Sequence, residues 1–270
     1  MTPAQQIERS IITTYRSKIW KRFAEGVRKY GLIKPGDRIA VCISGGKDSM
    51  LLAKCMQELK RHGTDNFGLE FIVMDPGYNP ENRRLVDENL ALLEIPAVVF
   101  SSQIFEAVES MGGSPCYMCA RMRRGHLYAK ARELGCNKIA LAHHFDDAIE
   151  TTLMGVLYNG RFQTMLPVLR STNFPGMELI RPLYMVREQD IIAWRDKNNL
   201  TFTRCACRFT EACDKIKDGP GESKRKEIKL LIRELKKNNP HADINIFNSV
   251  HNVNCDQLIR YKINGEWKET

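Results

Sequence analysis

The chain has 270 residues, of which 43% are hydrophobic and 27% are charged, as in ordinary globular proteins. No apolar run approaches the roughly 18 residues of a membrane span, and the first residues do not form a signal-peptide core, so we expect a cytoplasmic protein without a membrane partner. The formal net charge is +9, and residues 1–31 and 215–237 are the most basic segments. Such segments favour a polyanionic partner, and nucleic acid is the obvious candidate.

The first segment predicts one basic amphipathic helix, because apolar residues recur at helical spacing at Ile12, Tyr15, Ile19, Phe23 and Val27. After it, short apolar runs alternate with helical patterns. We expect strands at Arg38–Ile43, Leu69–Met74, Ala97–Phe100, Lys138–Ala142 and Leu179–Arg181. We expect helices at Ser49–Arg61, Asn82–Leu93, Tyr117–Leu134, Asp146–Tyr158 and Arg187–Asn198. This alternation predicts an α/β fold with a mainly parallel, Rossmann-like sheet.

The chain is expected to divide into three parts. Residues 1–34 form the basic N-terminal helix, residues 35–215 form the α/β domain, and residues 216–270 form a basic C-terminal appendage. The break is predicted at the turn Asp218-Gly219-Pro220-Gly221, after which the pattern is that of a basic helix. We expect this last part to be a helical appendage rather than a separate catalytic domain.

The most informative motif is Ser44-Gly45-Gly46-Lys47-Asp48-Ser49, which directly follows the first expected strand. Glycines let a phosphate approach the backbone, Ser44 and Ser49 add hydroxyl donors, and Lys47 adds positive charge. The motif is not a Walker P-loop, which needs GxxxxGK[ST]. It resembles the SGGxDS pyrophosphate loop of the ATP pyrophosphatases, which split ATP into AMP and pyrophosphate.

A second polar element follows the expected strand at residues 138–142. It reads His143-His144-Phe145-Asp146-Asp147 and resembles the GHHxDDxxET element of the same enzymes. Two carboxylates at a helix start could hold Mg²⁺ together with a triphosphate, although an aspartate there is also a common helix cap. Met74, at the end of the second strand, is expected on topology alone to meet adenine or ribose.

The clustered cysteines allow two interpretations. Cys116 and Cys119 form a CxxC, and Cys205, Cys207 and Cys213 follow much later in the chain. Four thiolates could form a closed zinc site, whereas three could hold an iron–sulfur cluster that has one iron without a protein ligand. A thioredoxin-like redox pair fits poorly. Cysteines 42, 55 and 136 lie in apolar contexts and are expected to be core residues.

The ordered series SGGKDS, PCYMCARMRRGHLY, KIALAHHFDDAIETT, LYNGRF and IRPLYMVREQDI, followed by a late cysteine cluster, resembles the tRNA 2-thiocytidine synthetase family over residues 20–210. The resemblance implies the adenine-nucleotide (PP-loop) type of sheet, ATP and Mg²⁺ as ligands, and a [4Fe-4S] cluster held by three cysteines. Two cluster ligands carry over to Cys116 and Cys119. The third falls where this chain has CxC, so Cys207 is expected and Cys205 is the alternative.

The resemblance also implies a reaction and its residues. An anticodon-loop cytidine would be adenylated at O2 and then thiolated, giving 2-thiocytidine, AMP and pyrophosphate. Residues 44–49, His143 and Asp146 would bind ATP, beside Met74 that topology alone places there, and Asp48, Arg123 and Asp147 would be catalytic. The partners would be tRNA and a sulfur donor, either sulfide or a persulfide derived from a cysteine desulfurase, and a homodimer is compatible with the family.

Two other functions remain open from the sequence. One is a different adenylating PP-loop enzyme, of the 2-thiouridine or lysidine type or acting on a small molecule, with zinc on the cysteines. The other is a tRNA-binding protein with a non-catalytic nucleotide site. The complete Lys47-Asp48-Ser49 and Asp146-Asp147 motifs argue against the second.

Overall fold

The computed structural model describes residues 1–63, 66–102, 115–203 and 220–269, with backbone alone at 115–121 and 220–223. The chain forms two compact units. Unit 1 comprises Met1–Asp146 and Leu166–Gly221, and unit 2 comprises Asp147–Met165 and Glu222–Thr270. In the part of the chain that is described, no helix is long and apolar enough to cross a bilayer.

Unit 1 is built on a six-stranded sheet with strand order β3-β2-β1-β4-β6-β5. Five strands are parallel and β5 is antiparallel to β6. The strands are β1 (Arg38–Ile43), β2 (Gly68–Asp75), β3 (Ala97–Ser101), β4 (Lys138–Ala140), β5 (Val168–Arg170) and β6 (Glu178–Ile180). The predicted α/β fold with a mainly parallel sheet is therefore confirmed, and β5 is an addition to the expected strands.

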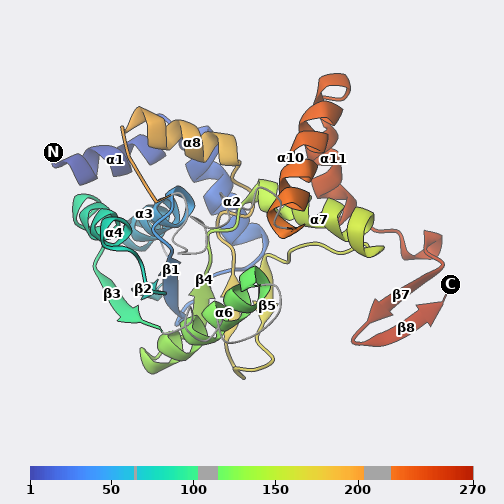
Figure 1. Cartoon of the computed structure of the whole chain (residues 1–270), viewed down its shortest axis with the longest axis horizontal. Helices are drawn as coiled ribbons and strands as arrows, with labels where there is room; N and C mark the ends of the chain where they lie inside the picture. The colour runs from blue at the N-terminus through green and yellow to red at the C-terminus, as the bar shows by residue number, and fades with distance from the viewer. Residues whose placement is uncertain (64–65, 103–114, 204–219, 270) are drawn as a thin grey trace. The chain divides into compact units, whose positions relative to one another are not determined.

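Helices cover both faces of this sheet (Figure 1). They are α1 (Pro3–Ile12), α2 (Lys21–Lys29), α3 (Lys47–His62), α4 (Pro80–Leu92), α6 (Pro115–Glu133) and α8 (Glu188–Lys197), while α7 (Phe145–Asn159) begins in unit 1 and continues in unit 2. Alternate residues of β1 face opposite layers. Ile39, Val41 and Ile43 join the core formed with the α1, α2, α3 and α8 layer, and Ala40 and Cys42 join the core under α6.

The N-terminal segment is interrupted rather than one continuous helix. A π-helical turn (Arg16–Trp20) separates α1 from α2, and the Tyr15 carbonyl accepts hydrogen bonds from the Ile19 and Trp20 amides. Ile11, not Ile12, is fully buried, so the buried positions are spaced by four residues along 11, 15, 19, 23 and 27. An α-helix would rotate such a stripe away from the core, and the wider π-turn compensates for this drift.

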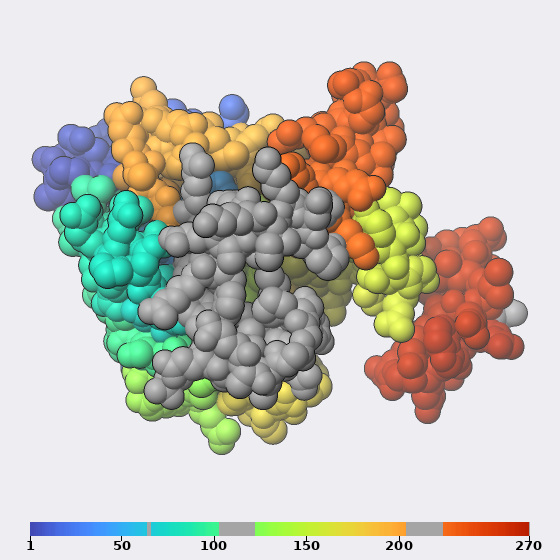
Figure 2. Space-filling model, in the orientation of Figure 1, coloured from blue at the N-terminus to red at the C-terminus, as the bar shows by residue number. Residues whose placement is uncertain are grey.

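Unit 2 contains most of α7 together with α10 (Pro220–Asn238), α11 (Ala242–Ser249) and a hairpin of β7 (Arg260–Ile263) and β8 (Glu266–Glu269). The hairpin, red in Figure 2, exposes most of its side chains, including Trp267. The expected helical appendage thus contains two strands in addition to its helices. Asn264 and Gly265 have φ values of 52° and 90°, so they make the tight turn that joins them.

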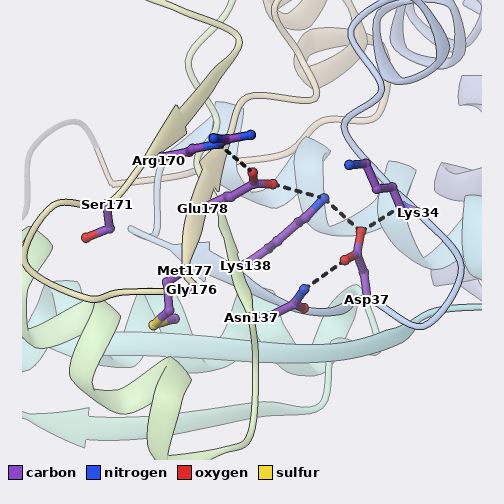
Figure 3. A pocket seen from close by; sticks show the side chains of 9 residues that line it. All are labelled: Lys34, Asp37, Asn137, Lys138, Arg170, Ser171, Gly176, Met177 and Glu178. Carbon is purple, nitrogen blue, oxygen red and sulfur yellow. Dashed lines mark hydrogen bonds and ion pairs between the residues drawn. The ribbon is translucent and has the colours of Figure 1, made fainter. Parts of the chain in front are cut away.

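A pocket of about 410 Å³ lies at the amino-terminal edge of the sheet (Figure 3). Buried Lys138 donates to Asp37, 2.8 Å away, and to the Leu32 carbonyl, and it lies 3.3 Å from Glu178. Burial alone would raise the pKa of Asp37, but hydrogen bonds from Lys138, Asn137 and the Lys34 amide hold that pKa below its usual value. This network joins the starts of β1 and β4 to the loop after α2, so its role is structural.

Candidate active site

The loop between β1 and α3 is shaped by a glycine that no other residue can replace without strain. Gly45 has a φ of +83°, in the left-handed region. A Cβ added there would lie 2.6 Å from Val86 Cγ2 and 2.9 Å from Thr203 Oγ1. The close approach of these side chains and the backbone turn together account for the first glycine of the motif.

The two serines of the loop organise its backbone. Ser49 Oγ donates to the Gly46 carbonyl at 2.9 Å and accepts the Ser44 amide at 3.1 Å. Ser44 Oγ donates to Ser49 Oγ at 3.2 Å. Gly46 precedes α3, and no side chain among the described residues caps this helix. The first turn of α3 therefore presents its backbone N–H groups at the carboxyl edge of the sheet, where an anion is stabilised by the helix dipole.

Charged side chains from three separate segments meet beside this loop. Lys47 Nζ lies 3.1 Å from Asp48 Oδ2 and 3.3 Å from Glu188 Oε1. The Glu188 amide donates to Asp146 Oδ2 at 2.7 Å. His144 completes the ring, because its Nε2 is 3.9 Å from Asp48 Oδ1 and its Nδ1 is 3.8 Å from Asp146 Oδ2. We call these five residues the polar ring.

Three members of the polar ring were predicted and two were not. Lys47, Asp48 and Asp146 come from the two recognised motifs, whereas His144 and Glu188 had no assigned role. His144 is 5% exposed, so its ring is held inside the site. The doubled histidine at 143–144 was the sequence signal that could have indicated a role for His144. Glu188 stands at the first position of α8, where an acidic residue is common for capping alone, so no sequence signal distinguishes its role.

Asp48 has one carboxylate oxygen available for a ligand. Its Oδ1 is buried and accepts no hydrogen bond from the described residues. Within the same described ranges, no group of three His, Cys, Asp or Glu side chains could hold a metal ion by itself. Magnesium commonly binds through one or two carboxylates and completes its shell with phosphate oxygens and water, so Asp48 suits Mg²⁺ that arrives with ATP.

Other predicted nucleotide residues lie near strand ends with varied exposure. His143 accepts a hydrogen bond at Nδ1 from Arg181 Nε, 3.3 Å away. Met74 precedes the last residue of β2, and its side chain is 3% exposed. Asp147 belongs to unit 2, where its Oδ1 is 3.6 Å from Arg225. The structure therefore separates the contacts of Asp146 and Asp147, and their roles stay predictions.

The predicted sulfur-handling residues are only partly described. Cys116 and Cys119 lie at the start of α6, and Arg123, with a half-buried side chain, lies further along the same helix. Cys207 and its alternatives Cys205 and Cys213 fall outside the described residues, so the predicted cluster ligands remain predictions.

The isolated cysteines are core residues, as expected. Cys42, Cys55 and Cys136 are 7%, 0% and 5% exposed. Burial raises the pKa of all three thiols, in the case of Cys136 to about 11. Because the thiolate is the reactive form, the raised pKa values agree with a packing role for these three cysteines.

A hollow of about 590 Å³ adjoins the loop on one side. Lys47, Asp48 and Glu188 line one part of it, and Arg195 and Phe202 line another. Its volume lies in the range of small-molecule sites, and its charged wall belongs to the polar ring. This wall makes the carboxyl edge of the sheet, rather than the pocket of Figure 3, the candidate active site.

Comparisons with known proteins identify the family. The family model described as "PP-loop domain" matches residues 13–207. The tRNA-cytidine(32) 2-sulfurtransferase of Pelobacter propionicus is 32% identical over 244 residues, covering 89% of this chain and 87% of the relative. The enzyme of that name from Geobacter sulfurreducens is 33% identical, and the match covers 90% of this chain and 92% of the relative.

A solved structure is similar in fold. The U34-tRNA thiolase NcsA from Methanococcus maripaludis with its [4Fe-4S] cluster has a TM-score of 0.65. The match covers 86% of this chain and 77% of the thiolase, at 20% sequence identity. At this identity the likeness establishes the shared fold.

Proposed function

The chain belongs to the PP-loop family, as a member of the tRNA-cytidine(32) 2-sulfurtransferases, and is a tRNA-thiolating enzyme; from this premise we propose that it converts cytidine 32 of tRNA into 2-thiocytidine through an adenylated intermediate. The observation that carries the proposal is the polar ring beside the glycine loop. It brings a lysine, two aspartates, a histidine and a glutamate to the edge of the sheet where nucleotides bind in such folds.

The proposed reaction has two substitutions. The cytidine O2 attacks the α-phosphorus of ATP, the bond to the β-phosphate oxygen breaks, and pyrophosphate leaves. A sulfur nucleophile then attacks C2, and AMP leaves with the original oxygen. The loop amides and Lys47 would neutralise the charge that develops on pyrophosphate. Adenylation is needed because oxide by itself is a very poor leaving group.

Asp48 and Asp146 are the residues that would hold Mg²⁺, with Asp147 as a further candidate. Asp48 Oδ1 accepts no hydrogen bond from the described residues, and this supports the assignment. When bound, Mg²⁺ neutralises phosphate charge. Glu188 contributes differently, since its carboxylate is 3.3 Å from Lys47 Nζ and orients that ammonium group before the triphosphate binds.

Cys116, Cys119 and Cys207 are the proposed ligands of a [4Fe-4S] cluster. Their chemistry fits, because three thiolates leave one iron without a protein ligand, and the buried cysteines are unsuited as substitutes. When bound, such a cluster supplies an iron that can accept a sulfur ligand. Arg123, in the helix that contains the CxxC, is proposed to contact phosphate during the reaction.

Two exposed cations near the C-terminal end of α10 are proposed to contact the tRNA backbone. Arg233 and Lys237 are both exposed on this helix. A target base in the anticodon loop is already unpaired, so its extrusion costs little. The sulfur donor is proposed to be sulfide or a persulfide from a cysteine desulfurase, with a cytoplasmic location and a homodimer as further expectations.

The test joins metal analysis to a substrate comparison. We expect about four irons per chain and a broad absorption band near 400 nm in protein purified without oxygen. We also expect pyrophosphate release to depend on tRNA and to disappear when cytidine 32 is replaced by adenosine in an otherwise identical transcript. One zinc without iron would contradict the cluster. Equal pyrophosphate release with both transcripts would contradict the assigned base.

A further inference from the structure

In unit 2, two cations of α10 face two carboxylates of α7. Arg225 Nε lies 3.3 Å from Glu150 Oε2, and its Nη1 lies 3.6 Å from Asp147 Oδ1. Lys229 Nζ lies 3.7 Å from Glu150 Oε1. The carboxylates are one helical turn apart on α7, and the cations are one turn apart on α10, so each pair lies on one side of its helix. We call these four residues the α7–α10 clamp.

Burial makes the clamp strongly dependent on its cations. The Glu150 side chain is 2% exposed and that of Asp147 is 17% exposed. A buried carboxylate is unfavourable unless a cation compensates it. Ile228 and Ile232, on the same side of α10 as the clamp cations, are 1% and 7% exposed. On the described part of α10, this side of the helix therefore combines buried apolar residues with the two cations that meet the α7 carboxylates.

Arg225 differs from Lys229 because it reaches both carboxylates. The guanidinium is a planar fork that spreads one positive charge over three nitrogens, so Arg225 makes ion pairs with both carboxylates at once. Asp147 is the second aspartate of the HHFDD motif and directly follows Asp146 of the polar ring. Through Arg225, the orientation of Asp147 and the position of α10 on α7 depend on each other.

We propose that Arg225 is a positioning residue for thiolation, which links tRNA bound on α10 to the orientation of Asp147. This inference rests on the proposed function, because it takes Arg233 and Lys237 of α10 as the tRNA contact. Binding of the tRNA backbone to α10 favours the position in which Arg225 meets both carboxylates. Asp147 then keeps one orientation during the reaction. Arg225 acts through Asp147 and touches no substrate itself.

The experiment compares two neighbouring cations of α10 in the full chain. R225A removes the clamp arginine, and K226A removes an exposed lysine one residue further along, with the same change in net charge. We expect R225A to lower kcat for tRNA-dependent pyrophosphate release about tenfold, the scale of a lost orienting contact, and to leave KM for tRNA no higher than in K226A. K226A should keep kcat. R225K should fall between wild type and R225A, because lysine lacks the fork.

A double variant separates positioning from stability. In R225A/E150Q the buried carboxylate that Arg225 compensates is also neutralised, so the unfolding temperature should recover toward that of the wild type. We expect kcat to stay low, because the double variant still lacks the guanidinium that lies beside Asp147. Recovery of kcat together with stability would overturn the proposal, as would equal kcat in R225A and K226A. Absence of tRNA-dependent pyrophosphate release in the wild type would instead contradict the proposed function, and the positioning role would fall with it.

Discussion

Replacing Glu188 with glutamine isolates the contribution of one charge in the polar ring. The Glu188 amide still donates to Asp146, because the backbone is unchanged, and the side chain keeps its shape. The change removes the negative charge of the ion pair with Lys47. We expect kcat for pyrophosphate release to fall while KM for ATP does not rise, because the removed negative charge also repels the triphosphate.

The size of this effect follows from the geometry. Two unit charges separated by the 3.3 Å between Lys47 Nζ and Glu188 Oε1 attract each other by about 5 kcal/mol at an effective dielectric constant of about 20. Water reduces this value, because 19% and 25% of the two side chains are exposed, and Asp48 still binds Lys47 at 3.1 Å. We therefore expect a net loss of about 1 kcal/mol, which corresponds to about a fivefold fall in kcat.

Steady-state pyrophosphate release with saturating tRNA and varied ATP measures both parameters. Glu88→Gln is the matched control, because it removes an exposed carboxylate on α4 that pairs with Arg84. It should leave kcat and KM unchanged. An E188Q enzyme with unchanged kcat and a raised KM for ATP would refute the argument, because Glu188 would then contribute to nucleotide binding and not to the orientation of Lys47.

Three further changes test the loop, the structural network and the cluster. G45A should lose ATP-dependent activity and about 2 kcal/mol of stability in urea unfolding, whereas G36A should lose less, because Gly36 shares the positive φ but a Cβ there meets open space. D37N should lose about 3 kcal/mol of unfolding free energy at pH 7, because a buried lysine loses its closest carboxylate. Because the pKa of Asp37 is lower in the folded state, the ionised carboxylate stabilises the fold above its unfolded pKa of about 4. This stabilisation disappears as the pH falls through the folded-state pKa. The unfolding free energies of D37N and wild type should therefore converge only below pH 4. C207A should lose iron measured per chain and C205A should retain it, and the reverse result would make Cys205 the third ligand.

Elements with strong local patterns were predictable from the sequence. β1 and the glycine loop were located correctly, because a buried apolar run followed by a conformationally special turn has few other interpretations. β5 could not be found, since three residues are too short to show an alternation. The C-terminal hairpin was missed although Asn264-Gly265 is a strong hairpin signal, because the basic helical pattern before it was extended too far.

The polar ring was only half predictable, for a physical reason. Lys47 and Asp48 lie within one motif, so their proximity is local. Glu188 lies 141 residues from Lys47 in the chain, and only the sheet order brings α8 to the glycine loop. The single π-helical turn before α2 was equally hidden, because the expected apolar stripe at 12, 15, 19, 23 and 27 mixes three- and four-residue steps, as an ordinary amphipathic helix does.

The doubled aspartate shows most clearly why a motif does not reveal its contacts. Successive residues of an α-helix point about 100° apart, so two neighbouring carboxylates at a helix start meet different surroundings. Asp146 accepts the first amide of α8, and Asp147 meets Arg225 of α10. The sequence alone predicts that the two aspartates are ligands of one cation. In the structure each carboxylate contacts a different helix. The second aspartate therefore has a reason to be present even where the first alone would suffice for a metal ion.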